Sequence, residues 1–199
     1  PGYEIKEWNE SNFDIRLNRY CEKAYAAQKW AFVSDVARLW ALVHEGGIYM
    51  DTDVELVRPL DRLLTNRAFL GFEGTQWVGT NLIGAEPSHS FFIELLKSYD
   101  HRCFITPDGK PDQTTNVEEL THKLEKAYGF RKDGSFQQLG DITLYPTDYF
   151  CPYDYIDGQL HRTENTYSIH WYSQTWIKRN QWINKLSQWM HRLTGNRMK

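Results

Sequence analysis

The chain has 199 residues, 41% of them hydrophobic, and a formal net charge of −3, which suits one domain with a substantial core. No apolar run approaches the length of a membrane span, and no signal peptide is recognisable. Six of the 23 Lys and Arg residues, but none of the 26 Asp and Glu residues, lie in 176–199. An acidic body with a basic tail excludes a general nucleic-acid binder, so we expect no nucleic acid among the partners.

Strands and helices alternate along the chain. In chain order, the hydrophobic pattern predicts a strand at 3–8, helices at 14–28 and 30–44, strands at 48–51 and 54–57, a short helix at 59–64, strands at 68–72 and 81–85, helices at 87–99 and 117–128, strands at 142–145 and 167–171, and a last helix at 176–193. The helix at 30–44 is apolar nearly all round and should be buried. Alternating strands and helices predict an α/β fold with a mainly parallel, doubly wound sheet.

The three cysteines, Cys21, Cys103 and Cys151, lack the spacing of metal ligands. An odd and sparse set of cysteines predicts free thiols in a reducing compartment. Because no signal peptide is recognisable either, we expect a cytoplasmic protein.

Within the stretch 46–55, an apolar run ends in two carboxylates, Asp51 and Asp53, which are separated by one residue. If that stretch is an extended strand, Asp51 and Asp53 point to the same side and Thr52 points away. Two carboxylates on one side repel each other unless a cation sits near them. Hard oxygen ligands without a cysteine favour Mg²⁺ or Mn²⁺, and the ion's free positions suit a diphosphate. Taken alone, the pattern is common, and a solvated acidic turn after a buried strand is the alternative.

The buried helix at 30–44 contains one charged pair inside it, Asp35 and Arg38. Residues three apart share a helix face, and charges on a buried helix are costly unless they are paired. The pair is either a structural ion pair or part of a polar pocket that meets ligand hydroxyls. The helix and the strand at 48–51 should end near the same edge of the sheet, where open α/β sheets bind ligands, so both interpretations stay open.

These motifs together carry a family resemblance. Asp35-x-x-Arg38 followed by the Gly-Gly-x-Tyr-x-Asp-x-Asp stretch that ends at Asp53 resembles the DXD-containing sugar transferases. This group includes the fungal outer-chain α-mannosyltransferase, bacterial capsule and lipopolysaccharide glycosyltransferases and, more distantly, the clostridial glucosylating toxins. The stretches 81–89 and 169–176 are also similar to segments of that family, so the resemblance covers most of the chain.

The resemblance implies a GT-A fold, which is Rossmann-like, with a mixed, mainly parallel sheet flanked by helices. It also implies a metal-dependent retaining glycosyltransferase that uses Mn²⁺ or Mg²⁺ and acts in surface polysaccharide synthesis. The donor would be a nucleotide-diphosphate sugar, either a UDP- or a GDP-sugar. The acceptor would be a glycan or a lipid-linked oligosaccharide.

The resemblance also assigns roles to residues. Asp53 would bind the metal directly, and Asp51 would meet the ribose or the metal's waters. Asp35 and Arg38 would hold donor-sugar hydroxyls, and Asn81 would lie near the transferred sugar. The expected catalytic residues are Asp35, Arg38 and Asn81; the expected donor-binding residues are Asp35, Arg38, Tyr49, Asp51, Thr175 and Trp176; the expected metal ligands are Asp51, Asp53 and His170. No carboxylate stands out as a nucleophile, which favours front-face attack.

The sequence departs from the family pattern at two points. The family opens with a strand and an aromatic residue that hold the nucleotide base, and nothing before Pro1 supplies them. We therefore expect a catalytic domain at 1–175 that lacks its first strand. The family's closing serine is replaced by Thr175, which keeps the hydroxyl, and Ser173 is a second candidate for that role.

Two other classes remain as alternatives. Phosphatases that form an aspartyl phosphate also carry Asp-x-Asp after an apolar strand, but they place Thr or Val where this chain has Glu55. A non-catalytic module that binds carbohydrate or a divalent cation would suit the abundant aromatics and acids, but it would not need the Asp35–Arg38 pair. Turnover of a sugar donor would separate that module from an enzyme.

The segment 176–199 is predicted to be a basic amphipathic helix. Its apolar residues fall on one stripe, namely Trp182, Ile183, Leu186, Trp189, Met190 and Leu193. A basic helix with tryptophan on its apolar face is typical of helices that lie on anionic membranes, so we expect peripheral attachment to the inner face of the membrane. Packing of the stripe on the catalytic domain or on a partner protein is the alternative.

Overall fold

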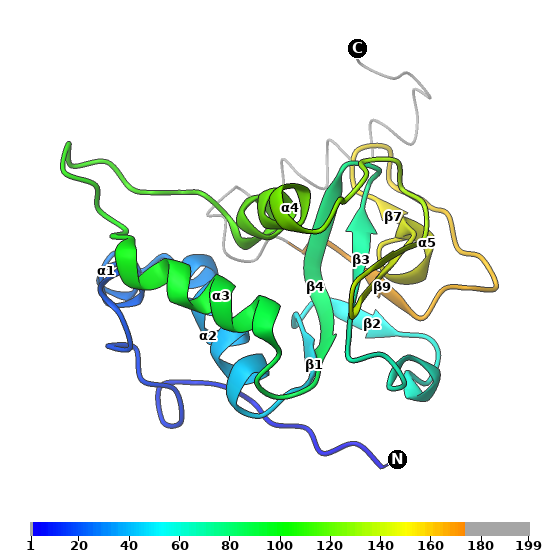
Figure 1. Ribbon diagram of the computed structural model, residues 1–199, viewed down its shortest axis with the longest axis horizontal. Coiled ribbons are helices and arrows are strands. Elements are labelled where there is room, and N and C mark those ends of the chain that lie inside the picture. The colour runs from blue at the N-terminus through cyan, green and yellow to red at the C-terminus, as the bar shows by residue number, and fades with distance from the viewer. Residues whose placement is uncertain (1, 174–199) are drawn as a thin grey trace.

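The computed structural model describes residues 2–173. The predicted C-terminal helix, and with it Thr175 and Trp176, lies outside the described residues. The described part is a mixed α/β structure, as the sequence predicted, in which a central sheet has α1, α2 and α3 on one side and β2, β9 and α5 on the other (Figure 1). This arrangement is compatible with a GT-A-like fold.

The central sheet has five strands in the order β1-β4-β3-β6-β5. These strands are β1 at Gly47–Met50, β3 at Ala68–Glu73, β4 at Trp77–Ala85, β5 at Gln137–Leu139 and β6 at Ile142–Tyr145. Only the β3–β6 pairing within this sheet is parallel, and the other three pairings are antiparallel. The expectation of a mainly parallel sheet is therefore wrong.

Short turns explain two of the three antiparallel pairings, β3–β4 and β5–β6. The connection from β3 to β4 pairs Glu73 with Trp77 and turns at Gly74, whose φ is +67°. The connection from β5 to β6 turns at Gly140, whose φ is +64°. A loop of two or three residues can join only antiparallel neighbours, because a parallel pair needs a crossover of a dozen or more residues. Glycine supplies the positive φ that such turns require.

Two small sheets flank the central one. In the first, β2 at Val54–Leu56 pairs antiparallel with β9 at Ser168–His170. In the second, β7 at Tyr153–Asp154 pairs with β8 at Gln159–Leu160. The first of them matters for the site, because it brings a late segment of the chain next to the residues that follow β1.

The helices are α1 at Arg19–Ala26, α2 at Trp30–His44, α3 at Ser90–Ser98, α4 at Asn116–Ala127 and the short α5 at Thr147–Phe150. Single 3₁₀ turns occur at Asp61–Leu63 and Tyr99–His101. Helix α2 has the predicted bounds. Helix α1 begins later than predicted, because Asn18 caps it by accepting a hydrogen bond from the Cys21 amide. No strand forms at 3–8, where Trp8 instead packs edge-on against Trp40.

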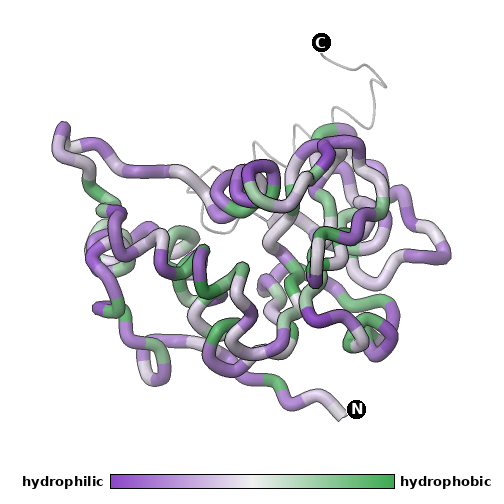
Figure 2. Tube along the Cα trace, in the orientation of Figure 1, coloured by the Kyte–Doolittle hydropathy of each residue, from purple (hydrophilic) through white to green (hydrophobic). Residues whose placement is uncertain are grey.

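The core has two layers, one on each face of the sheet. Alternate residues of β3 supply both: Leu70 and Phe72 face the helices, and Phe69 faces the layer of β2, β9 and α5. Apolar stretches of α2 and α3 lie where these helices meet, whereas the loop before α4 is mostly polar (Figure 2). Cys21, Cys103 and Cys151 are free, as expected. Among residues 2–173, none of the helices has both the length and the apolarity that crossing a bilayer requires.

Candidate functional site

Three predicted metal ligands converge beside the end of β1. One ligand atom from each of Asp51, Asp53 and His170 lies within 4.8 Å of the other two. The pairing of β2 with β9 sets Val54 opposite His170, so the residues just before β2 lie next to the imidazole. The two aspartates are not in a strand, since the Val54 amide donates to the Asp51 carbonyl at 3.2 Å and closes a turn. Their convergence was predicted, but the reason given for it, alternation along a strand, is wrong.

Asp53 is held from the segment that follows β9. Its Oδ2 accepts hydrogen bonds from the Ser173 amide at 2.9 Å and from the Ser173 hydroxyl at 3.0 Å. The Nε2 atom of His170 lies 3.3 Å from its Oδ1. The contact with His170, helped by those from Ser173 and opposed by partial burial, holds the pKa of Asp53 well below its usual range. Asp53 is therefore an anion at neutral pH, as a metal ligand must be.

Asp51 is held from the side of α2. Its Oδ1 accepts a 2.6 Å hydrogen bond from the Tyr49 hydroxyl and lies 3.5 Å from Nη1 of Arg38. The Arg38 guanidinium also sits 4.7 Å from the centre of the Tyr49 ring. Tyr49, which was predicted to bind the donor, thus contacts Asp51 and Arg38. Both carboxylates of the motif are fixed by neighbouring side chains.

The pair Asp35–Arg38 is buried, and it also reaches the acidic motif. Nη2 of Arg38 lies 3.2 Å from Oδ1 of Asp35, and their side chains are 7% and 11% exposed. Nη1 of Arg38 donates to the carbonyl of Thr80 at 2.8 Å and to its hydroxyl at 3.0 Å. Burial alone would lower the pKa of Arg38, but the surrounding phenol and carboxylates more than reverse that effect. The arginine therefore stays charged between two aspartates.

Asn81, the other predicted catalytic residue, is buried on β4. Its backbone carbonyl accepts from the Asp51 amide at 2.8 Å, and its Oδ1 accepts from the Cys151 thiol at 3.2 Å. Within the described residues, the Nδ2 of Asn81 and the Nδ1 of His170 are buried donors or acceptors without a protein partner. Unpaired buried polar atoms are costly, so these two atoms, which belong to residues that contact the aspartates, are available to a bound ligand.

Sequence reasoning missed several residues that contact this cluster. Thr80 was not singled out, although it binds Arg38 through both its carbonyl and its hydroxyl. Trp171 donates its backbone amide to the Asp53 carbonyl at 3.0 Å and its indole N–H to Glu55 at 2.9 Å. Ser173 was only a second candidate for the closing hydroxyl, yet it binds Asp53. For Trp171 and Ser173, the sequence signal that could have found them is the similarity of the late segment 169–176 to the family.

Comparison with known proteins finds a sugar-transferase family that is similar to the first part of the chain. Residues 1–70 match the family described as "Glycosyltransferase sugar-binding region containing DXD motif". That region contains both aspartates of the motif and the Asp35–Arg38 pair. The resemblance to DXD-containing sugar transferases is therefore confirmed.

Two of the three similar proteins described here are sugar transferases by name, and the third is a synthase of a mannosylated lipid. A mannosyl phosphorylinositol ceramide synthase of Saccharomyces cerevisiae is 40% identical over 68 residues, which are 34% of this chain and 18% of that protein. The human alpha-1,4-N-acetylglucosaminyltransferase is 26% identical over 165 residues, which are 79% of this chain and 46% of that protein. The inositol phosphoceramide mannosyltransferase 1 of Schizosaccharomyces pombe is 36% identical over 106 residues, 51% of this chain and 32% of that protein. The chain thus spans less than half the length of each of these relatives. No solved structure matches it significantly.

Proposed function

We propose that the protein is a metal-dependent, retaining glycosyltransferase that moves a sugar from a UDP- or GDP-sugar to a glycan or lipid-linked acceptor. The observation that carries this proposal is the convergence of Asp51, Asp53 and His170 within 4.8 Å, in a chain whose first 70 residues match the DXD family. The family match favours this function over an aspartyl-phosphate phosphatase and over a non-catalytic binding module.

The donor set fits a divalent cation. Two carboxylates and an imidazole would hold Mn²⁺ or Mg²⁺, and the imidazole, a softer ligand than oxygen, favours Mn²⁺ of the two. When bound, the ion would neutralise charge on the diphosphate. Asp53 already carries the negative charge that binding needs, and the Ser173 and His170 contacts fix its orientation.

The surrounding side chains would orient the donor. Asp35 and Arg38 would bind hydroxyls of the sugar, and Tyr49 and Arg38 would keep Asp51 aimed at the ribose or at waters of the ion. The buried, unpaired Nδ2 of Asn81 would donate to the transferred sugar. Thr175 and Trp176, which lie outside the described residues, would close over the diphosphate.

The transfer itself needs no enzymic nucleophile. The bond from the anomeric carbon to the diphosphate oxygen breaks, and its electron pair stays on the diphosphate. The acceptor oxygen bonds to the same face of that carbon, so configuration is retained, and the hydroxyl proton passes to the leaving diphosphate oxygen. The sugar carries oxocarbenium character in between. Fixed hydrogen-bond donors around the diphosphate stabilise the charge where it develops.

A donor screen tests this function. The full chain is incubated with a panel of UDP- and GDP-hexoses and Mn²⁺, and release of nucleotide is measured with and without EDTA. We expect turnover of at least one donor, its loss in EDTA, and its loss in Asp53→Asn. Asp133→Asn is the matched control, because Asp133 also accepts from the amide and hydroxyl of a serine two residues on but lies outside the cluster. Full turnover by Asp53→Asn, or in EDTA, would refute the metal assignment.

Location and pathway are further parts of this proposal. The names of the two fungal relatives specify inositol phosphoceramide, a phosphate-bearing lipid, which supports a lipid-linked acceptor. A lipid acceptor suits a cytoplasmic enzyme attached peripherally to the inner face of an anionic membrane through 176–199. The expected role in surface polysaccharide synthesis remains a prediction.

A further inference from the structure

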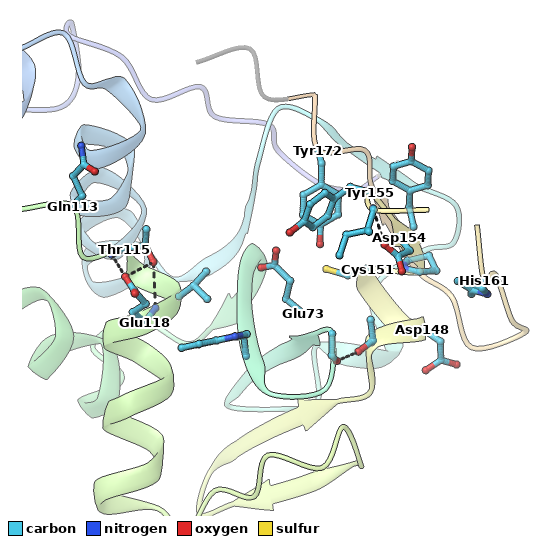
Figure 3. A pocket seen from close by; sticks show the side chains of 17 residues that line it. Glu73, Gln113, Thr115, Glu118, Asp148, Cys151, Asp154, Tyr155, His161 and Tyr172 are labelled. Atoms are coloured by element: carbon cyan, nitrogen blue, oxygen red, sulfur yellow. Dashed lines mark hydrogen bonds between the residues drawn. The ribbon is translucent and has the colours of Figure 1, made fainter. Parts of the chain in front are cut away.

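A cleft of about 900 Å³ opens beside the metal-ligand cluster. Glu73, Cys151 and Tyr172 lie at its inner end, between the start of α4 on one side and the segment around Asp154 and Tyr155 on the other (Figure 3). Its size falls in the range of clefts that bind small organic ligands. None of its lining residues was assigned a role above.

Aromatic rings connect the cleft to the cluster. The ring of Tyr172 lies 3.9 Å from that of His170, and the ring of Tyr155 lies 4.9 Å from that of Tyr172. Tyr172 has a φ of +48°, a conformation that a bulky residue rarely adopts. The thiol of Cys151, which lines the cleft, also binds Asn81. A ligand in the cleft would therefore lie next to the place where we expect the transferred sugar.

The charge of the lining is one-sided. It includes four acids, Glu73, Glu118, Asp148 and Asp154, and among the described lining residues no lysine or arginine. Lys132 lies 5.2 Å from the ring of Trp77 at the rim, but it is paired with Glu125 at 2.8 Å. Burial raises the pKa of the Glu73 carboxyl, and the contacts with His170 and Tyr172 only partly oppose that effect.

A lining of carboxylates and aromatic rings would favour some classes of acceptor over others. A phosphate or carboxylate in the cleft would face four carboxylates, and among the described lining residues only His161 could carry a positive charge. Like charges in one site repel each other, so an anionic ligand would be disfavoured. Sugar hydroxyls, in contrast, can donate to those carboxylates, and the apolar faces of sugar rings can lie against tyrosine and tryptophan rings.

We propose that this cleft is the acceptor site and that it takes an uncharged saccharide, discriminating against acceptors that carry phosphate or carboxylate beside the reacting hydroxyl. The inference rests on the proposed transferase function and adds the class of acceptor. It also separates this chain from relatives whose names specify a phosphate-bearing acceptor, at least for the sugar unit that enters the cleft.

The first test concerns the aromatic wall. Binding of methyl α-mannoside, methyl β-galactoside and methyl N-acetyl-β-glucosaminide is measured by saturation-transfer NMR, and transfer to them is measured with the active donor. Tyr155→Ala should weaken acceptor binding and raise the acceptor KM about tenfold. Phe136→Ala is the matched control, because Phe136 is 53% exposed and Tyr155 is 51% exposed, and Phe136 does not line the cleft.

The second test concerns charge. Each neutral glycoside is compared with its 6-phosphate or its uronic acid as an acceptor. The wild type should prefer the neutral form, and Ile156→Lys, which adds a cation at an exposed lining position, should reduce that preference about tenfold. Ile5→Lys adds the same charge at an exposed position outside the cleft and should leave the preference unchanged.

The outcomes separate the two proposals. If the wild type hydrolyses no donor, the transferase function itself fails. If it hydrolyses a donor but binds none of the neutral glycosides, or uses acidic acceptors equally well, the acceptor inference is overturned and the function stands. Equal losses in Tyr155→Ala and Phe136→Ala would overturn it too, because the effect would then not come from the cleft.

Discussion

Replacing Arg38 with alanine should destabilise the fold far more than the same change at Arg67. Both arginines meet two carboxylates: Arg38 meets Asp35 and Asp51, and Arg67 meets Glu86 and Asp141. Their burial differs, since the side chain of Arg38 is 7% exposed and that of Arg67 is 61% exposed. The two substitutions therefore compare similar ion pairs in different surroundings.

The expected loss of unfolding free energy depends on the carboxylates that each substitution leaves without a partner. Removing one partner of a buried ion pair costs about 3–5 kcal/mol, because the remaining charge is desolvated and uncompensated. Arg38→Ala leaves the Asp35 carboxylate in that state and also strips two hydrogen bonds from Thr80. Exposed pairs contribute little because water screens them, so Arg67→Ala should cost far less than Arg38→Ala. A loss of about 4 kcal/mol is a large part of the usual 5–15 kcal/mol of a domain.

Urea unfolding followed by tryptophan fluorescence measures both values by linear extrapolation. Equal losses of unfolding free energy in the two variants would refute the reasoning, because the buried pair would then stabilise no more than an exposed one. Arg38→Lys provides a finer comparison, since lysine keeps the charge but lacks the planar fork that reaches an aspartate and Thr80 together. It should recover part of the stability and, if the pair also binds donor sugar, little of the turnover.

Three further predictions follow from the site. Glu73→Gln should raise the free energy of unfolding at pH 7, because burial raises the pKa of Glu73 and the ionised form is disfavoured in the fold. In urea titrations at several pH values, the gain should vanish below the unfolded pKa of 4.5 and grow as pH rises through the folded pKa. A gain that is independent of pH would contradict this cause. Asp53→Asn should lower the free energy of unfolding above pH 3.8, a difference that shrinks as pH falls through the depressed pKa, and Mn²⁺ should raise the Tm of the wild type but not of this variant. A chain ending at Thr175 should lose sedimentation with anionic vesicles, whereas the full chain should bind them less in high salt; unfolding on truncation, or binding that ignores lipid charge, would contradict membrane docking.

Local signals predicted those elements that their own residues determine. Helix α2 has the predicted bounds because its apolar residues recur at helical spacing and Gly46 ends it with a φ of +68°. Strand directions were not predicted, because they depend on which strands are neighbours. The turn at Gly74 could have given one of them, since a strand that ends there and resumes three residues later is a hairpin. The two-residue strands β7 and β8 carry too few residues to show any period.

The candidate site shows a different limit. The motif residues Asp51, Asp53 and His170 could be named from the sequence because the family resemblance joins segments more than a hundred residues apart. Tyr172 and Glu73 could not, because nothing local marks an aromatic residue or an acid as lining a cleft. They reach the site through contacts across the chain, such as the tilted contact between the rings of Tyr172 and His170.

The two interpretations of the Asp35–Arg38 pair turn out not to exclude each other. The guanidinium is satisfied within the protein by Asp35 and Thr80, which is what a structural ion pair requires. It also approaches Asp51, which places a fixed positive charge behind one carboxylate of the acidic motif. A charge in that position reduces the repulsion between Asp51 and Asp53 before any cation arrives, so the aspartates can stay close together in the fold. The stability of α2 and the geometry of the acidic motif are therefore coupled through one side chain, and a variant at Arg38 should change both.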